Sequence, residues 1–137
     1  MRAQVTFHRA TNSIYTRVIS VPFPSSREVL SLDEQNIVPW LESLPLWYKE
    51  SADIPSLYSF SHAVMMWRYH NLRLIMYRPF VIRKLLKTRQ GQSSGSVNND
   101  DNEAYSRCLN EAAISIKMIN KFWSTQPHTK LAAWYAL

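Results

Sequence analysis

The chain has 137 residues, a formal charge of +6 at pH 7 and a single cysteine. This length fits one domain, and one cysteine excludes both a disulfide within the chain and a cysteine-based zinc site. Residues 1–9 lack the apolar core of a signal peptide, so the cytoplasm or the nucleus is the expected location.

The first part of the chain predicts two helical stretches. Residues 3–19 carry apolar side chains every three or four positions, which is the period of an amphipathic helix. Ser25 and Glu28 form a capping-box pattern that begins the second stretch. Pro39 predicts a kink or break there, because an interior proline costs about 3 kcal/mol. Pro45 ends this stretch, and an irregular segment follows. The apolar positions of the first helix are Ala3, Phe7, Ala10, Ile14 and Val18.

A long central helix is predicted to begin at Pro55. Residues 64–82 are apolar or aromatic on nearly every side, which is typical of a helix buried in a large core or in a membrane. An arginine recurs at every fifth position and argues against the membrane. We therefore expect protein on all sides of this helix, more than the chain itself supplies. Pro79 predicts a bend near Tyr77. The expected core face is Leu57, Phe60, Val64, Trp67 and Leu74.

A polar segment, residues 90–102, contains both glycines of the chain. It has too few apolar groups to offset the entropy of ordering, so we expect a disordered internal loop. Asp100, Asp101 or Asn102 is expected to cap the helix that follows. A last helical segment, 129–137, stops without a cap, which suggests a fragment of a larger helical domain or a truncated gene model. The stripe expected on the helix after the loop is Tyr105, Cys108, Leu109, Ala112, Ile116, Ile119 and Trp123.

The fold class expected is therefore all-α. Strand alternation and hairpin signals are absent from the sequence. We expect an irregular array of four to five helices around the long, kinked central helix, with residues 1–137 forming part of one helical domain.

The sequence has no strong catalytic, phosphate-binding or metal-binding motif, so we expect neither enzymatic activity nor a bound cofactor. Both glycines lie in the polar segment, away from any strand–helix junction that could cradle a phosphate. His62 and His70 are too far apart along a helix to share a metal ion, so each of the histidines is expected to be a surface or paired core imidazole. Cys108 is expected in the core. The pair Asp33 and Glu34 could do acid–base chemistry only in a pocket.

Residues 83–89 form a local basic cluster. The favoured interpretation is a solvated helix end whose charge suits the C-terminal helix dipole. The alternative is a binding surface for phosphate or for an acidic partner.

Three blocks, residues 37–48, 67–86 and 107–137, together resemble the central regulatory (middle homology) region of fungal zinc-cluster (Zn2Cys6) transcription factors, in the branch of the galactose-pathway activators. The Arg78-Pro79-Phe80 triplet is the most recognisable element. The resemblance implies an all-helical regulatory region of a nuclear factor that controls transcription by RNA polymerase II. It also implies that zinc and DNA are bound by a separate N-terminal module with six cysteines, which this chain lacks.

The resemblance implies no catalytic residues and no cofactor in this chain, and its partners would be protein co-regulators or the rest of the same polypeptide. A small-molecule effector is a further alternative, although no residue of the sequence supports it. Asn71 and the arginines are expected to be buried, with Arg68 and Arg78 paired to carbonyls or to a carboxylate such as Glu111. The alternative function is a free-standing helical adaptor. The structural and interaction candidates are Trp40, Trp67, Arg68, Tyr69, Asn71, Arg78, Pro79, Phe80, Trp123 and Trp134.

Overall fold

The computed structural model describes residues 2–49, 54–91, 98–125 and 129–136. Every regular element in these ranges is a helix, which confirms the all-α class and the long central helix. In chain order the elements are α1 (Arg2–Val18), α2 (Ser26–Leu32), the π-helix η1 (Asp33–Ile37), α3 (Val38–Glu42), α4 (Leu46–Lys49), α5 (Ser56–Arg89), α6 (Asn99–Thr125) and α7 (Lys130–Ala136).

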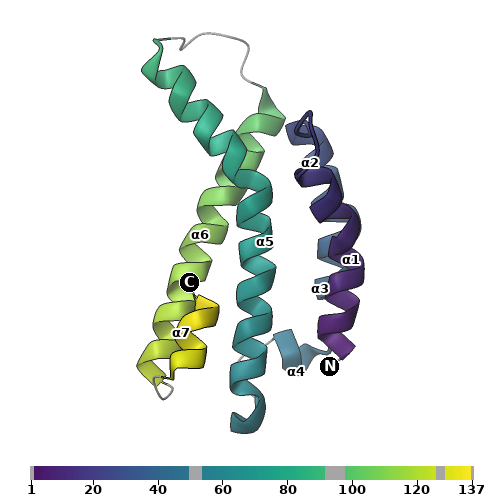
Figure 1. Ribbon diagram of the computed structural model, residues 1–137, viewed down its shortest axis with the longest axis vertical. Helices are drawn as coiled ribbons and strands as arrows, with labels where there is room; N and C mark the ends of the chain where they lie inside the picture. Colours follow the sequence, from purple (N-terminus) through teal and green to yellow (C-terminus); the bar gives the residue numbers. More distant parts are fainter. Residues whose placement is uncertain (1, 50–53, 92–97, 126–128, 137) are drawn as a thin grey trace.

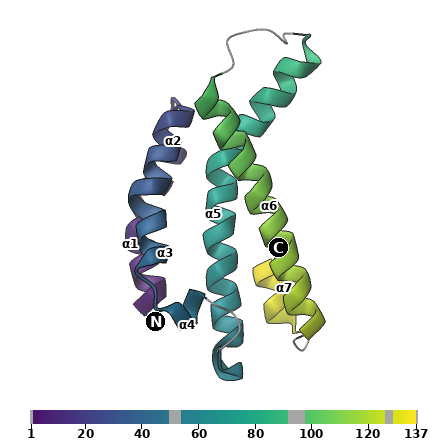
Figure 2. The same ribbon diagram turned by 180° about the vertical axis from the view of Figure 1, so that it is seen from behind.

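Helix α5 runs through the middle of the molecule (Figure 1). Helices α1, α2 and α3 lie on one side of it, and α7 and most of α6 lie on the other (Figures 1 and 2). The first turns of α6 cross α5 and lie beside α2. The most extensive packing is between α5 and α6. The core therefore has α5 at its centre and one group of helices on each flank.

The local predictions for α1 and α2 are confirmed. Phe7 and Ile14 on α1 are buried, and the other members of the predicted stripe pack against the same core. The Ser25 side chain accepts a hydrogen bond from the Glu28 N–H (3.3 Å) and so caps α2. Arg17, in the last turn of α1, forms an ion pair with Glu28 that ties the two helices together.

Of the two outcomes predicted at Pro39, a kink or a break, the break does not occur. The backbone remains helical from α2 through η1 into α3, because η1 is a wider π turn in which the Val38 N–H reaches the Asp33 carbonyl. Pro39 then lies in the first turn of α3, where its missing N–H is least costly. The helix does end before Pro45, as predicted. The irregular segment predicted next is wrong in part, since Leu46–Lys49 form the short helix α4.

Helix α5 begins at Ser56, one residue later than predicted. It contains Pro79, and its upper part leans away from its lower part in Figure 1, as expected for a helix with an interior proline. Leu57, predicted in the core, is 80% exposed.

The prediction that α5 needs more protein than the chain supplies is wrong for its middle. The flanking helices of the chain itself bury most of this part on both sides. Ile75 is the one large apolar residue between Phe60 and Val81 that is exposed. The fully or nearly fully enclosed side chains include Met65, Trp67, Tyr69, Leu72, Met76, Tyr77 and Phe80.

The predicted loop 90–102 is shorter in the structure. Gly91 follows the C-cap of α5 with a left-handed φ of +68°, a conformation that glycine adopts at little cost. Residues 92–97 lie outside the described residues. Helix α6 already begins at Asn99, and the Asn98 side chain accepts a hydrogen bond from the Asp100 N–H (3.1 Å). The predicted caps at residues 100–102 are therefore wrong, since all three lie within the first turn.

The buried face of α6 also differs from the predicted stripe. The residues it buries are Ala104, Cys108 and Glu111. Leu109 is exposed, and Ile116 is 69% exposed. The first half of α6 therefore turns small and polar side chains toward α5, whereas Met118, Ile119 and Phe122 of its second half pack against α5. The predicted stripe is right for Cys108 and Ile119 and wrong for Leu109 and Ile116.

Candidate functional site

A cluster of charged and polar side chains lies where η1, α5 and α6 meet. We call it the Asp33 cluster, and its members are Asp33, His70, Arg73, Tyr77, Arg107 and Glu111. The Asp33 side chain is 0% exposed. It accepts two hydrogen bonds from Arg73, through Nε (3.1 Å) and Nη2 (2.7 Å), a bidentate arrangement. The Tyr77 hydroxyl donates to the same carboxylate (2.6 Å), and Arg107 Nη1 adds a longer contact (3.3 Å).

A second buried carboxylate, Glu111, completes the cluster. It accepts a hydrogen bond from Arg73 Nη1 and lies 2.6 Å from Nδ1 of His70. Arg73 therefore bridges a carboxylate of η1 and a carboxylate of α6. Arg107 carries a second positive charge and also pairs with Glu34 and with Glu103 at the surface. The two arginines balance the charges of the two buried carboxylates, as burial of charge requires.

The surroundings of Arg73 and Tyr77 keep these two hydrogen-bond donors protonated. Burial acts to lower the pKa of Arg73, but its hydrogen bonds to Asp33 and the charge of that carboxylate outweigh burial and raise the pKa above its ordinary value. Burial raises the pKa of the Tyr77 hydroxyl, and the negative charge of Asp33 raises it further. Neither group is poised to exchange a proton near neutral pH. The cluster therefore acts as a cross-link between three elements, and this is a structural role for the Asp33 and Glu34 pair.

The predicted aromatic candidates divide between core and surface. Trp40 and Tyr69 stack in the main core (5.8 Å between ring centroids), and Phe80 is buried in the same cluster. Trp67 packs against Phe122 in a second cluster (5.1 Å). Pro79 and Trp123 are half-buried, and Trp134 is 77% exposed.

The prediction that Asn71, Arg68 and Arg78 are buried is wrong. Asn71 and Arg78 are exposed, and Arg68 is half-buried with its guanidinium 5.3 Å from the ring centroid of Tyr135. Successive arginines spaced by five residues are rotated by about 140° around a helix. Only Arg73 therefore faces the two buried carboxylates, and Glu111 pairs with it instead of with Arg68 or Arg78.

Sequence reasoning missed Arg73, Tyr77 and Arg107 as members of a site. One signal was available for Arg73, since a charged residue in an otherwise apolar helix must find a partner. The predictions for the cysteine and for the three histidines in the described ranges are confirmed. The His62 Nε2–H donates to the Tyr48 carbonyl (2.6 Å), His70 is paired with Glu111, and Cys108 is buried, which raises the pKa of its thiol. His8 is exposed, and residue 128 lies outside the described ranges.

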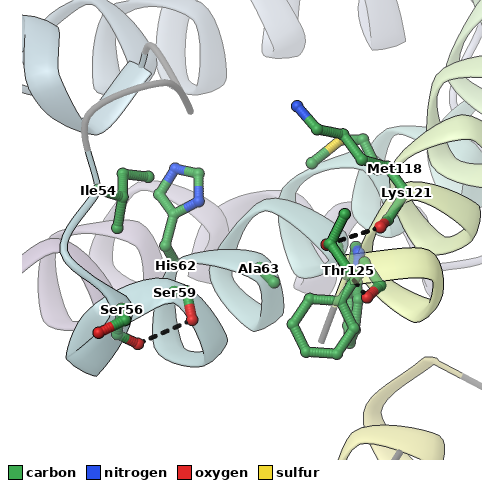
Figure 3. Close-up of a pocket in the computed structure, with 10 residues that line it drawn as sticks. Ile54, Ser56, Ser59, His62, Ala63, Met118, Lys121 and Thr125 are labelled. Carbon is green, nitrogen blue, oxygen red and sulfur yellow. Dashed lines mark hydrogen bonds between the residues drawn. The ribbon is translucent and has the colours of Figure 1, made fainter. Parts of the chain in front are cut away.

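A pocket of about 300 Å³ lies between α5 and α6 and includes His62, Lys121 and Thr125 in its lining (Figure 3). Two of its hydroxyl groups are already used, as Figure 3 shows: Ser59 donates to the Ser56 carbonyl (2.8 Å) and Thr125 to the Lys121 carbonyl (2.9 Å). Another pocket, of about 440 Å³, lies between α1, α4, α5 and α7.

A third pocket, of about 200 Å³, differs from these two, and we call it the Ser115 cavity. Among the described residues, two buried side-chain polar atoms have no hydrogen-bond partner, Trp67 Nε1 and Ser115 Oγ. Both residues line this cavity. Its walls are Trp67, Arg68, Asn71, Leu74, Ser115, Ile119 and Tyr135.

Neither a metal-binding cluster nor a helix fit to cross a membrane occurs among the described residues. In the described ranges, no three His, Cys, Asp or Glu side chains are grouped so that they could hold a metal ion. None of the helices in these same ranges is both long enough and apolar enough to cross a membrane.

Large apolar side chains are exposed at the basic end of α5. Ile82, Leu85 and Leu86 are each about half exposed, and Leu85 is 55% exposed. We call these three residues, with Lys87 and Arg89, the distal α5 surface.

Comparison with family models, curated proteins and solved structures finds no match to this chain. The resemblance to zinc-cluster regulators therefore stays a prediction from the sequence blocks.

Proposed function

We propose that this chain is the protein-interaction part of the regulatory region of a fungal zinc-cluster transcription factor, acting in the nucleus. The observation that carries the proposal is the distal α5 surface. Its positions 82, 85, 86 and 89 are spaced by three or four residues, so they share one face of the helix. An apolar strip of this kind, rimmed by charge, is typical of a protein-binding surface.

The charge of this surface indicates the partner. No acidic residue occurs between Asp53 and Asp100, so the whole of α5 carries positive charge without compensation from its own sequence. The complementary partner is a helical protein segment with apolar residues on one face and Asp or Glu beside them. Electrostatic attraction would speed its association, and burial of the leucines would stabilise the complex.

Burial of residues in the blocks that resemble zinc-cluster regulators supports a scaffold role for these residues. Trp40, Tyr69 and Phe80 pack in the core that holds α5 against its neighbours. Under this proposal they hold the helix in place, and the exposed end of α5 binds the partner. Zinc and DNA would be bound by a module outside this chain.

The alternative is a free-standing helical adaptor, and one observation favours it. The middle of α5 is enclosed by helices of the chain itself, so the chain builds its own core. An adaptor would use the same distal α5 surface but would have no link to transcription.

A tethering experiment tests the proposal. The chain is fused to a DNA-binding module and directed to a reporter promoter in fungal cells. We expect a severalfold change in transcription relative to the DNA-binding module alone, and loss of this change in the double variant Ile82→Asp, Leu86→Asp. The matched control is Val5→Asp, which alters an exposed apolar residue of α1. Unchanged transcription combined with partner binding would leave the adaptor as the function. Full activity of the double variant would exclude the distal α5 surface as the binding site.

A further inference from the structure

We propose that the Ser115 cavity binds a compact organic carboxylate, with the carboxylate held by the N–H and O–H groups of its walls. The lining residues come from three helices, α5, α6 and α7. Six of the seven lining residues belong to α5 and α6, whose contact is the most extensive in the described residues, and Tyr135 comes from α7, which packs on α5.

The first argument is the pair of unsatisfied polar atoms. Trp67 is 5% exposed, and its Nε1–H has no acceptor. Ser115 Oγ is also buried without a partner. Buried polar groups in native proteins are nearly always paired, so two exceptions at one cavity require an explanation. An indole N–H can only donate. The group missing at Trp67 must therefore be an acceptor, and Ser115 Oγ offers a second polar contact in the wall of the same cavity. Trp67 also lines the pocket of Figure 3.

The second argument is charge. Arg68 is the one formally charged residue that lines the cavity. No carboxylate of the described residues lies within ion-pair distance of it. Its guanidinium is positioned by the Tyr135 ring instead, 5.3 Å from the ring centroid. An arginine held in this way at a cavity wall attracts an anion, and its planar N–H groups suit a carboxylate.

The third argument is the remaining lining. Leu74, Ile119 and the rings of Trp67 and Tyr135 give the cavity apolar walls. The volume of about 200 Å³ far exceeds the space of roughly 10–15 Å³ that one water needs. The ligand therefore combines a carboxylate with a small apolar body. The pocket of Figure 3 is a weaker candidate, because the hydroxyl groups of Ser59 and Thr125 already donate to carbonyls.

The Trp67 indole N–H signal in a nitrogen-15 NMR spectrum reports directly on this site. The probes are 4-methylpentanoate, benzoate and 3-phenylpropanoate, each compared with its neutral amide. We expect at least one acid to shift the Trp67 signal saturably, and its amide to bind more weakly. Ser115→Ala and Arg68→Gln should each weaken binding roughly tenfold, as expected for the loss of a hydrogen bond to a charged group.

Two matched variants serve as controls. Ser106→Ala changes an exposed serine of the same helix, and Arg9→Gln removes a positive charge from an exposed position of α1. Both should bind the acid as the parent protein does. The proposal is overturned if none of the three acids moves the Trp67 signal, if acid and amide bind equally, or if Ser115→Ala and Arg68→Gln bind like the controls. It is also overturned if a crystal soaked with the acids holds only ordered water at both atoms. None of these results affects the distal α5 surface, which belongs to a different part of α5.

Discussion

Two polar regions along α5 and α6 are organised in opposite ways. In the Asp33 cluster each carboxylate has several donors, and Arg73 bridges both of them. In the Ser115 cavity the polar atoms of Trp67 and Ser115 have no partner at all.

The difference in hydrogen bonding indicates which of the two regions stabilises the fold and which is suited to bind a ligand. A buried network in which every group is paired fixes the relative position of the elements that contribute to it. A buried donor without an acceptor adds nothing to folding and costs free energy until an acceptor arrives. The Asp33 cluster therefore holds η1, α5 and α6 together, whereas the Ser115 cavity retains polar groups for a ligand.

The largest effect is expected from Asp33→Ala. The substitution leaves the Tyr77 hydroxyl without its acceptor and leaves two arginines beside one buried carboxylate, Glu111, in place of two. The expected loss in the free energy of unfolding is about 3–5 kcal/mol, measured by urea denaturation. Glu34→Ala is the matched control, because Glu34 is the neighbouring carboxylate and makes one exposed ion pair with Arg107. Its cost should stay below about 1 kcal/mol. Equal costs for the two variants would mean that the cluster is not the central cross-link.

Tyr77→Phe tests the same cluster with a smaller change. It removes the hydroxyl that donates to Asp33 (2.6 Å) and keeps the buried ring. A hydrogen bond to a charged group contributes about 1.5–3 kcal/mol, so a loss of about 2 kcal/mol is expected in the same denaturation experiment. Tyr58→Phe alters an exposed tyrosine of α5 and should change stability very little. A neutral Tyr77→Phe would show that the arginines alone satisfy Asp33.

The features that sequence predicted correctly depend on residues close together in the chain. The stripe of α1, the Ser25 cap and the helix end before Pro45 each follow from a few neighbouring positions. A break at Pro39 does not occur because a π turn precedes the proline, and a π turn has no comparable local signature in sequence. The buried face of α6 was predicted only in part, because apolar periodicity ranks Leu109 and Ile116 above Glu111. In the fold, Arg73 requires that carboxylate to face inward.

The Asp33 cluster itself could not be read from the sequence. Asp33 and Arg73 are 40 positions apart, and Asp33 and Arg107 are 74 apart. The sequence indicated that the arginines of α5 rotate around the helix, but not which of them meets a carboxylate. That choice depends on how η1 and α6 pack against α5. The same holds for the Ser115 cavity, since an unpaired atom is defined only by its surroundings in space.

Ser115→Ala tests the opposite side of the comparison. The hydroxyl has no partner, so its removal should leave stability unchanged or raise it by up to about 1 kcal/mol, in the absence of any ligand. Ser124→Ala on the same helix is the matched control, because the Ser124 hydroxyl donates to the Asn120 carbonyl (2.8 Å) and has a partner to lose. The gain should therefore be larger at residue 115. A clear loss of stability in Ser115→Ala would show that the hydroxyl is paired in solution.

The smallest effect concerns His62, which joins α5 to the Tyr48 carbonyl. Burial lowers the pKa of His62 from its ordinary value of 6.5, although the bond to the carbonyl acts in the opposite direction. Between the lowered pKa and about 6.5, the unfolded chain binds more protons than the folded one. The contribution of His62 to stability is thus fully present above pH 6.5 and falls as the pH drops below that value.

His62→Gln keeps a donor for the carbonyl but cannot take up a proton. The difference in the free energy of unfolding between parent and variant should therefore shrink or reverse as the pH is lowered from 7.5 to 5.5. Chemical denaturation at several pH values measures this difference. Ser61→Ala changes the preceding residue without a titrating group, and its effect on stability should be the same at every pH. A parallel pH dependence for parent protein and His62→Gln would mean that the imidazole is as free to protonate in the fold as in the unfolded chain.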